Sequence, residues 1–404
     1  MKIITQKYGG SSVATTEKIR RIAEKVKKRV DGGYKLIVVL SAMGKTTDNL
    51  IALSEEITLK PSAREMDMLL STGEQVTIAL FSMALHELNV GAISLTGHQA
   101  GIVTDTVHRK AKIVSIDNNR IMKEFETNDV VVVAGFQGID QEHNISTLGR
   151  GGSDLSAVAI AAALRTECCE IYTDVDGVFT ADPRIVPAAK HIPEISFDEM
   201  LELASSGAKV MQARSIECGK KYNMPIWVKN TFNDTTGTLI KEEDETMEKV
   251  MIRGVALEKK EAKVTLKSVP DKPGIAAEVF SRLGAGNINV DMIVQNSSTD
   301  GTTDISFTAP KEDLPVMMET ANKIAKEIGA PKVDVNPSIA KVSIVGIGMR
   351  SHAGVAAKMF RVLADNNVNI DMISTSEIKI SVVVPEKDGE KAMQSLHAAF
   401  ELDK

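Results

Sequence analysis

The residues best placed to do chemistry in this sequence form a glycine turn near the N-terminus, Lys7-Tyr8-Gly9-Gly10-Ser11-Ser12. Gly9 and Gly10 carry no side chain, so their backbone N–H groups can approach an anion closely. Lys7 supplies a positive charge beside them. The pattern favours an anionic ligand such as a phosphate, although a tight turn that only joins a strand to a helix fits the two glycines alone equally well.

A second glycine turn favours the anion interpretation. Residues 149–154 read Gly-Arg-Gly-Gly-Ser-Asp, so three glycines surround Arg150, and Asp154 follows at the start of an alanine-rich helix over 155–164. We expect Ser153 to be the N-cap of that helix. Because the first N–H groups of a helix have no partner within it, its N-terminus attracts anions. The sequence therefore predicts a second anion site opposite the first.

Further polar residues stand where predicted strands end. Residues 35–40 and 129–134 are apolar enough to be buried strands, and small polar turns follow them at 41–48 and 135–138. Ligands of open α/β sheets bind outside the carboxyl ends of the strands, so these turns are candidate binding segments. Gly73 and Glu74 interrupt a helical pattern over 64–89, either because Gly73 packs closely against another backbone or because Glu74 is presented to a ligand.

This set of residues suits phosphoryl transfer, which depends on positioning and on neutralisation of charge by Lys, Arg and Mg²⁺. No Walker spacing follows the glycines, and no Gly-x-Gly-x-x-Gly pattern follows the first strand, which excludes a P-loop enzyme and a Rossmann dehydrogenase. None of the seven histidines lies in these motifs. A phosphoryl acceptor that is already ionised, such as a side-chain carboxylate, needs no general base.

The composition limits the classes of partner. The 404 residues carry 48 basic and 54 acidic side chains, a net charge of −6, with no long basic run, which argues against a nucleic-acid surface. We find neither an apolar run of about 18 residues nor a signal-peptide pattern, so we expect a cytoplasmic protein with no membrane contact. The three cysteines have no disulfide or Cys-x-x-Cys spacing and are expected to be reduced.

The length and the patterning predict several domains. Residues 1–240 alternate strand and helix patterns, and the acidic segment 241–250 is expected to be a linker. A repeat follows in which Asp271-Lys272-Pro273-Gly274 matches the segment 351–354, at an offset of 80 that persists to Asp291 and Asp371. Each copy shows the β-α-β-β-α-β pattern of a ferredoxin-like unit, with predicted bounds 251–336 and 337–404.

Taken together, these motifs resemble the aspartokinases over nearly all of the chain. The resemblance rests on Lys7 to Ser12, the turn 41–47, Ser71-Thr72-Gly73-Glu74, residues 147–154, residues 173–184 and the paired C-terminal units, which resemble ACT domains. It implies an α/β amino-acid-kinase fold, with a mainly parallel open sheet between helices, followed by two ACT units. It also implies transfer of a phosphoryl group from ATP, with Mg²⁺, to L-aspartate, giving 4-phospho-L-aspartate.

The resemblance assigns roles to individual residues. Lys7 and Asp154 are expected to be catalytic, and no side-chain metal site is expected beyond Mg²⁺ carried by ATP. The residues expected on the nucleotide side are Lys7, Tyr8, Gly9, Gly10, Ser41, Thr173, Asp174, Phe179, Arg184 and Lys209, although Lys209 also fits a solvent-exposed lysine. Those expected to bind aspartate are Thr47, Glu74, Arg150, Gly151, Gly152 and Ser153.

The C-terminal units are expected to bind lysine or threonine, or both, as inhibitors. The expected effector contacts are Asp271, Gly274, Ile275, Ala276, Asn289, Gln295, Asn369, Ile370, Ser376 and Glu377. A duplicated dimerisation module without a ligand is the alternative. We expect a homo-oligomer, or assembly with a small subunit made only of ACT units and translated from an internal start at Met247.

Two other functions remain open from the sequence. One is another carboxylate kinase of the same fold, acting on glutamate or acetylglutamate, although such enzymes lack the paired ACT units. The other is a catalytically weak amino-acid sensor, which the presence of Lys7, Asp154 and Lys209 disfavours.

Overall fold

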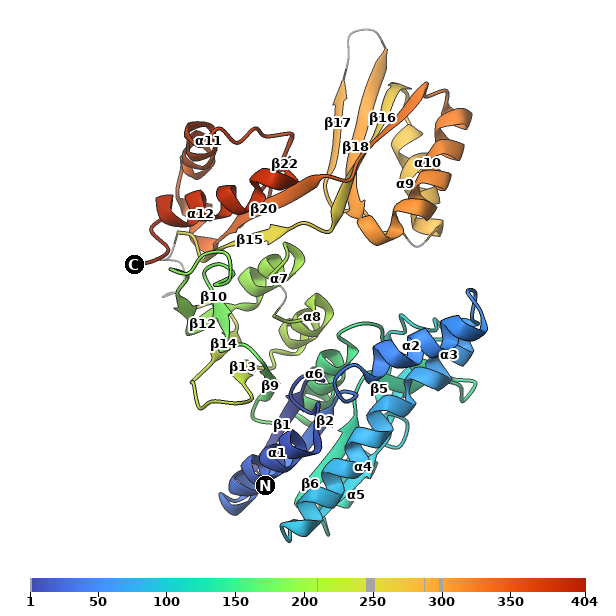
Figure 1. Ribbon diagram of the computed structural model, residues 1–404, viewed down its shortest axis with the longest axis vertical. Coiled ribbons are helices and arrows are strands. Elements are labelled where there is room, and N and C mark those ends of the chain that lie inside the picture. The colour runs from blue at the N-terminus through green and yellow to red at the C-terminus, as the bar shows by residue number, and fades with distance from the viewer. Residues whose placement is uncertain (1, 209, 245–250, 287, 298–300) are drawn as a thin grey trace. The chain divides into compact units, whose positions relative to one another are not determined.

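The computed structural model describes the whole chain except residues 1, 209, 245–250, 287 and 298–300 (Figure 1). It divides into two compact units. The first comprises Met1–Val178, His191–Ala204 and Lys209–Glu245, and the second comprises Phe179–Lys190, Ser205–Ala208 and Thr246–Lys404. Residues 179–190 and 205–208 therefore belong to the second unit, although the sequence placed them inside a domain over 1–240. Met247 and residues 245–250 of the predicted linker lie outside the described residues.

The first unit is built on an eight-stranded sheet with the order β12-β14-β13-β9-β1-β2-β6-β3. The strands from β13 to β3 run parallel, and only the β13–β14 pair is antiparallel. This confirms the predicted mainly parallel open sheet. The strands are β1 (Lys2–Tyr8), β2 (Tyr34–Leu40), β3 (Ala92–Leu95), β6 (Val130–Ala134), β9 (Cys169–Thr173), β12 (Glu194–Ser196), β13 (Ile226–Asn230) and β14 (Thr238–Lys241).

A smaller four-stranded sheet with the order β5-β4-β7-β8 belongs to the same unit. Its strands are β4 (Ile102–Thr104), β5 (Ile113–Ile116), β7 (Gln137–Ile139) and β8 (Ile145–Thr147). Two short strands, β10 (Val178–Phe179) and β11 (His191–Ile192), lie where the chain passes between the units. The helices are α1 (Thr16–Asp31), α2 (Thr46–Ile57), α3 (Ala63–Leu70), α4 (Thr72–Glu87), α5 (Asn119–Glu124), α6 (Gly152–Leu164), α7 (Phe197–Ser205) and α8 (Ala213–Tyr222).

Helices cover both faces of the large sheet. Side chains alternate along a strand, so Ile4, Leu36 and Val132 lie on one face, in a core shared with α1 and α4. The opposite face packs against α6, whose residues Gly152–Ala161 are all buried. A helix that is apolar or small on every side is suited to this central position. Lys7, whose side chain pairs with a residue of α6, belongs to this second face.

Two helix starts near the glycine turns are defined by their cap residues. The N-cap of α1 is Thr15, whose hydroxyl accepts a hydrogen bond from the Lys18 backbone N–H. Ser153 is not the N-cap of α6, because the helix begins at Gly152 and Gly151 takes the cap position in a left-handed conformation. Only glycine adopts that conformation without strain, and it leaves Ser153 inside the first turn.

One helical stretch among the described residues, Ala63–Glu87, is long and apolar enough to cross a membrane by length and composition alone. Half of its most apolar window is buried, and Phe81 and Leu85 pack in the core with α1. Because core helices pass the same test, the stretch is weak evidence for a membrane span.

The second unit contains two four-stranded sheets, each covered by two helices. The first sheet has the order β17-β18-β16-β19, and its strands and helices follow each other as β-α-β-β-α-β, as the sequence predicts. Its elements are β16 (Glu261–Pro270), α9 (Ile275–Ala285), β17 (Ile293–Ser297), β18 (Thr302–Pro310), α10 (Leu314–Ile328) and β19 (Lys332–Asn336).

The second sheet departs from the expected boundaries. Its order is β15-β20-β22-β21, so the fourth strand comes from β15 (Gly254–Glu258), ahead of the whole first copy of the repeat. Residues 254–258 thus complete the second copy, although the sequence grouped them with the first. The other elements are β20 (Ile339–Val345), α11 (Val355–Asp365), β21 (Met372–Thr375), β22 (Lys379–Pro385) and α12 (Gly389–Ala399).

A buried ion-pair cluster joins the two copies. The Lys341 side chain on β20 is 2% exposed, and its ammonium pairs with Asp291 and, at 2.8 Å, with Glu261 on β16. Burial alone would lower the pKa of Lys341, but the two carboxylates raise it above its ordinary value. Met292 and Met372, equivalent residues of the repeat, pack together beside Ile339. The two copies of the repeat thus contact each other through both ion pairs and apolar side chains.

Candidate active site

The candidate site lies at the edge of the large sheet that is formed by the carboxyl ends of its parallel strands. The parallel register aligns Tyr8 with Leu40 and with Tyr172, and Leu40 with Ala134. The chain leaves β1, β2, β6 and β9 at nearly the same level, and the residues next after these strands are Gly9, Ser41, Gly135 and Asp174. The predicted polar turns therefore do meet at the carboxyl ends of neighbouring strands.

The turn after β1 packs against the turn after β2. The Gly10 carbonyl accepts a hydrogen bond from the Gly44 N–H at 3.0 Å, and the Gly9 N–H donates to the Tyr172 carbonyl at 3.3 Å. A Cβ atom on Gly10 would lie 2.9 Å from the Ala42 carbonyl oxygen, closer than real Cβ contacts. Gly10 is thus required by close backbone packing, whether or not an anion binds beside it.

Lys7 and Asp154 form an ion pair at the centre of this edge. The Lys7 ammonium lies 2.6 Å from a carboxylate oxygen of Asp154, and the two side chains are 12% and 11% exposed. A Cβ atom on Gly9 would lie 3.4 Å from the same ammonium, so the glycine leaves the space beside Lys7 open. The two predicted catalytic residues are therefore in contact, with the first glycine turn next to them.

The second glycine turn meets the same edge. Gly149 and Gly151 have φ angles of 81° and 76°, in the left-handed region that favours glycine. A Cβ atom on Gly135, directly after β6, would lie 2.8 Å from the Ser153 side chain. The N-terminus of α6 therefore starts at the end of β6, and Arg150, on the turn before it, is exposed.

Glu74 is a buried carboxylate in which only one oxygen has a hydrogen-bond partner among the described residues. Its residue is 3% exposed, and one carboxylate oxygen accepts the Ala42 N–H at 3.1 Å. The other oxygen, Oε2, has no hydrogen-bond partner in the described part of the chain. Burial raises the pKa of Glu74 from an ordinary 4.5 to about 7. Gly73 also packs closely, but against the Ala42 side chain and not against another backbone, since a Cβ there would lie 2.9 Å from that side chain. Presentation of Glu74 to a ligand stays a prediction.

Other residues predicted on the nucleotide and aspartate sides are spread over the same edge. Ser41 donates its backbone N–H to the Tyr8 carbonyl, Thr47 lies in the first turn of α2, and the Thr173 hydroxyl donates to Asp174. The Tyr8 side chain is 1% exposed and stacks on Tyr172 with ring centroids 4.7 Å apart. Tyr8 can therefore reach a ligand only through its backbone.

Three predicted nucleotide residues cannot be placed at this edge. Phe179 and Arg184 belong to the second compact unit, where the Arg184 guanidinium pairs with Asp182 at 2.7 Å. Lys209 lies outside the described residues. Among the described residues, no group of three or more His, Cys, Asp or Glu side chains could hold a metal ion.

Four of the predicted effector residues, Asp271, Gly274, Ile275 and Ala276, lie at or just before the start of α9 in the second unit. The others lie beside two strands: Asn289 and Gln295 before and on β17, and Asn369, Ile370, Ser376 and Glu377 on either side of β21. Gly274 and Gly354 are the N-cap residues of α9 and α11, with φ angles of 98° and 90°, and a Cβ on either would meet no atom within 4 Å. Left-handed backbone conformation, and not close packing, explains these glycines. The exposed members of the predicted set are Asp271, Gly274, Asn289, Gln295, Asn369, Ser376 and Glu377, while Ile275, Ala276 and Ile370 are half-buried.

A network of charged side chains around Glu170 on β9, next to β1, was not predicted from the sequence. Glu170 on β9 is 2% exposed and accepts from Gln6, Arg29 and Lys229. Burial would raise the pKa of Glu170, but Lys229 and Arg29 hold it below its ordinary value. These residues come from four separate elements, so no local spacing could have revealed them. A charged residue inside an otherwise apolar strand was the only available signal.

The fold and the site define a class of protein, an amino acid kinase with ACT domains. Residues 2–230 match the amino acid kinase family, and residues 264–326 and 342–400 each match an ACT domain. The chain is 52% identical over 404 residues to an aspartate kinase of Stutzerimonas stutzeri, covering 100% of this chain and 98% of the relative. It is also 52% identical over 405 residues to an aspartokinase of Pseudomonas aeruginosa, with the same coverage.

The chain belongs to the aspartokinase family, as the motifs predicted. Solved structures agree with this. The structure of Escherichia coli aspartokinase III in complex with aspartate and ADP is 27% identical, with a TM-score of 0.83 over 98% of this chain and 99% of that one. The complex of the same enzyme with lysine and aspartate is 28% identical, with a TM-score of 0.74 over 98% and 99% of the two chains.

The raised pKa of Glu74 predicts a pH-dependent cost to folding. Below pH 4.5 the carboxyl is protonated in both states and costs nothing; as pH rises towards 7 the unfolded chain loses the proton while the folded chain keeps it. We expect Glu74→Gln to gain up to about 3 kcal/mol of unfolding free energy over wild type across this window, and no more above it. Urea unfolding at pH 4.5, 6 and 8 measures this.

Glu56→Gln is the matched control, since Glu56 is exposed on α2. Its free energy of unfolding should differ from wild type by the same small amount at all three pH values. A Glu74→Gln difference that is equally flat would show that the buried carboxyl ionises normally.

Proposed function

We infer that this chain is an ATP-dependent aspartate kinase, which transfers the γ-phosphoryl group of ATP to the side-chain carboxylate of L-aspartate. The observation that carries the inference is the Lys7–Asp154 ion pair between two glycine turns, in a chain that matches aspartokinases along its whole length. The bound aspartate and ADP of Escherichia coli aspartokinase III support the same pair of substrates.

The proposed chemistry needs charge neutralisation and little proton transfer. Lys7 and the Gly10 N–H are proposed to neutralise the charge that develops on the γ-phosphoryl group, since the Gly9 N–H is held by the Tyr172 carbonyl. Asp154 holds the Lys7 ammonium in place. The acceptor carboxylate of aspartate is ionised at neutral pH, so no base has to deprotonate it. This agrees with an edge whose predicted residues include no histidine.

The acceptor is proposed to bind between Glu74 and the second glycine turn. The unpartnered Oε2 of Glu74 suits the α-ammonium of aspartate, and the exposed Arg150 guanidinium suits one of its carboxylates. An ammonium beside Glu74 also removes the cost of an unpaired buried carboxylate. Thr47 and the turn residues Gly151, Gly152 and Ser153 complete the proposed acceptor site.

The nucleotide is proposed to bind along the ends of β1, β2 and β9. Ser41, Thr173 and Asp174 follow or end these strands, and Tyr8 contributes only its backbone. Phe179, Arg184 and Lys209 stay predictions from the resemblance. Mg²⁺ carried by ATP would need few protein ligands, because phosphate and water supply most of them. The Asp154 carboxylate beside Lys7 would be the residue to hold it, and the ion would help to neutralise the phosphate charge.

An acceptor comparison tests the proposed activity. Coupled ADP release should give the highest kcat/KM with L-aspartate, and far lower values with glutamate and N-acetylglutamate. Lys7→Ala should lower kcat with aspartate on the order of a hundredfold or more, because charge stabilisation of the transferred group is lost. Lys27→Ala, on the surface of α1, should keep kcat. Preference for another acceptor, or normal kcat in folded Lys7→Ala, would contradict the assignment.

Feedback regulation is proposed for the ACT pair. Escherichia coli aspartokinase III binds lysine together with aspartate in its T state, which supports lysine as an effector here, with threonine as a second candidate. The N-termini of α9 and α11 present backbone N–H groups that suit an α-carboxylate, and the exposed Asp271 can pair with an ammonium. We further propose a cytoplasmic homo-oligomer, or assembly with an ACT-only small subunit.

Substitution of Asp271 tests the regulatory proposal. Inhibition of wild type by lysine or threonine, alone or together, should weaken about tenfold or more in Asp271→Ala, since coupling of 1 to 3 kcal/mol is typical of allosteric sites. The uninhibited kcat should not change. Asp365→Ala, an exposed aspartate at the far end of α11, serves as the control and should keep wild-type inhibition. Absence of any inhibition in wild type would refute the proposal.

A further inference from the structure

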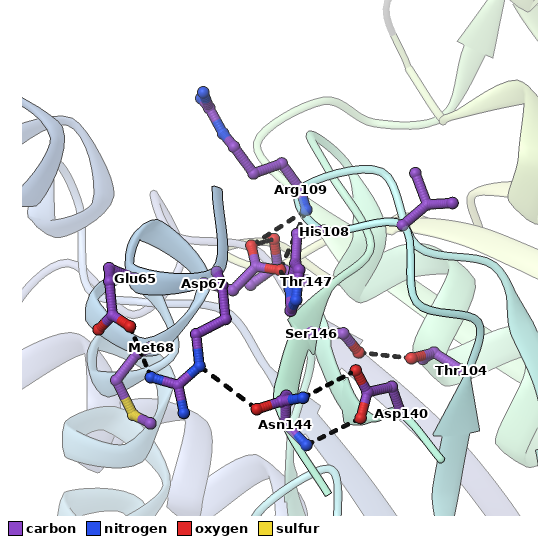
Figure 2. A network of polar contacts seen from close by, with 12 residues as sticks. Glu65, Asp67, Met68, Thr104, His108, Arg109, Asp140, Asn144, Ser146 and Thr147 are labelled. Atoms are coloured by element: carbon purple, nitrogen blue, oxygen red, sulfur yellow. Dashed lines mark hydrogen bonds and ion pairs between the residues drawn. The ribbon is translucent and has the colours of Figure 1, made fainter. Parts of the chain in front are cut away.

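Asp67 is a fully buried carboxylate that no part of the proposed chemistry uses. It lies on α3 at 0% exposure and accepts hydrogen bonds from three residues. The Thr147 hydroxyl donates to it at 2.5 Å, the Arg109 backbone N–H at 3.0 Å, and the His108 ring Nδ1 lies 2.8 Å away. Figure 2 shows the His108 side chain and the Arg109 backbone from the loop before β5, and the Thr147 side chain from the end of β8, meeting at Asp67, while the Arg109 side chain points away.

The segments bonded to Asp67 adjoin the second glycine turn. Thr147 is the last residue of β8 and stands two residues before Gly149. The Thr147 carbonyl accepts the Ala111 N–H at 3.0 Å, which joins the two held segments to each other. A Cβ atom on Gly149 would lie 2.9 Å from the Arg109 carbonyl oxygen. The backbone at Arg109 is thus one wall against which the glycine turn is packed.

Arg109 itself has an unfavourable backbone conformation. Its φ angle is 67°, in the left-handed region that costs a residue other than glycine about 1 kcal/mol or more. Both carboxylate oxygens of Asp67 lie within 3.1 Å of the Arg109 N–H, so the buried charge holds this conformation in place. Strained backbone kept by a buried charge beside a ligand-binding turn points to a positioning role.

A second set of contacts holds the same turn from α8. The Arg214 guanidinium donates to the carbonyls of Leu148 and Ala111, both at 2.8 Å. The Gln212 side-chain amide donates to the Arg150 carbonyl at 2.7 Å. The turn is therefore held from two sides, by the Asp67 carboxylate on α3 and by the side chains of Gln212 and Arg214 at the start of α8.

We propose that Asp67 is a positioning residue for the phosphoryl acceptor, which sets the backbone of Gly149 to Gly152 so that Arg150 and the N-terminus of α6 meet an acidic amino acid. The inference rests on the proposed function, because it assigns this turn to the acceptor. Asp67 acts through Thr147 and Arg109 and touches no substrate. Misplacement of a binding turn by a fraction of an ångström weakens every contact that the turn makes with its ligand.

Asp67→Asn is the direct test, since it keeps the volume but replaces one accepting oxygen by a donor that faces N–H and O–H groups. We expect the KM for aspartate to rise about tenfold or more, while the KM for ATP stays within about twofold. A merely structural role would lower the melting temperature or the yield of active enzyme without separating the two KM values.

Asp140→Asn is the matched control. Asp140 is also a buried carboxylate, 3% exposed, and it accepts the Glu142 and Asn144 N–H groups in the turn between β7 and β8. It contacts neither Arg109 nor Thr147 in the described network (Figure 2), so both KM values should stay near wild type. If Asp67→Asn does not fold, Thr147→Val removes one donor at constant shape and should raise the KM for aspartate about threefold, again without moving that for ATP.

The outcomes separate this inference from the proposed function. Wild type that does not phosphorylate aspartate refutes the function itself. If wild type does and Glu74→Ala raises the KM for aspartate, but Asp67→Asn and Thr147→Val leave both KM values alone or move them equally, then only the positioning role of Asp67 is refuted.

Discussion

The ion pair between Lys7 and Asp154 is the interaction on which the rest of the site depends. It requires Lys7 to be the next-to-last residue of the central strand β1, on the face covered by α6. It also requires α6 to begin at Gly152, two residues after Arg150. A buried pair is stable only when both charges are present, because removal of one leaves the other desolvated. The alternation of side chains along β1 and the helix start in the second glycine turn therefore have to agree.

Close backbone packing makes that agreement possible. Gly10, Gly135 and Gly73 each bring a strand-end turn or a helix nearer to a neighbour than any larger residue would allow. The same packing buries Glu74 beside the end of β2 with one oxygen unpartnered in the described structure. An unsatisfied buried carboxylate costs stability, and such a cost is typical of binding sites, where a ligand supplies the missing partner.

Much of this arrangement could be predicted from the sequence, because it is local. Glycine turns after apolar runs identify strand ends, and the offset of 80 identifies the repeat. Other features depend on tertiary contacts. Residue spacing predicts neither the contacts of Asp67 with Thr147, Arg109 and His108 nor the burial of the Tyr8 ring. A repeat pattern alone also cannot show that the strand at 254–258 pairs with β20 of the second copy.

Lys7 and Asp154 are expected to act as one catalytic unit, and a double-mutant cycle measures whether they do. The kcat for aspartate phosphorylation would be compared in Lys7→Met, Asp154→Asn and the double variant. Groups that act together are strongly non-additive, so the double variant should be about as slow as the slower single variant. If the two single-variant effects on kcat multiply in the double variant, Lys7 and Asp154 have independent roles and do not act as one unit.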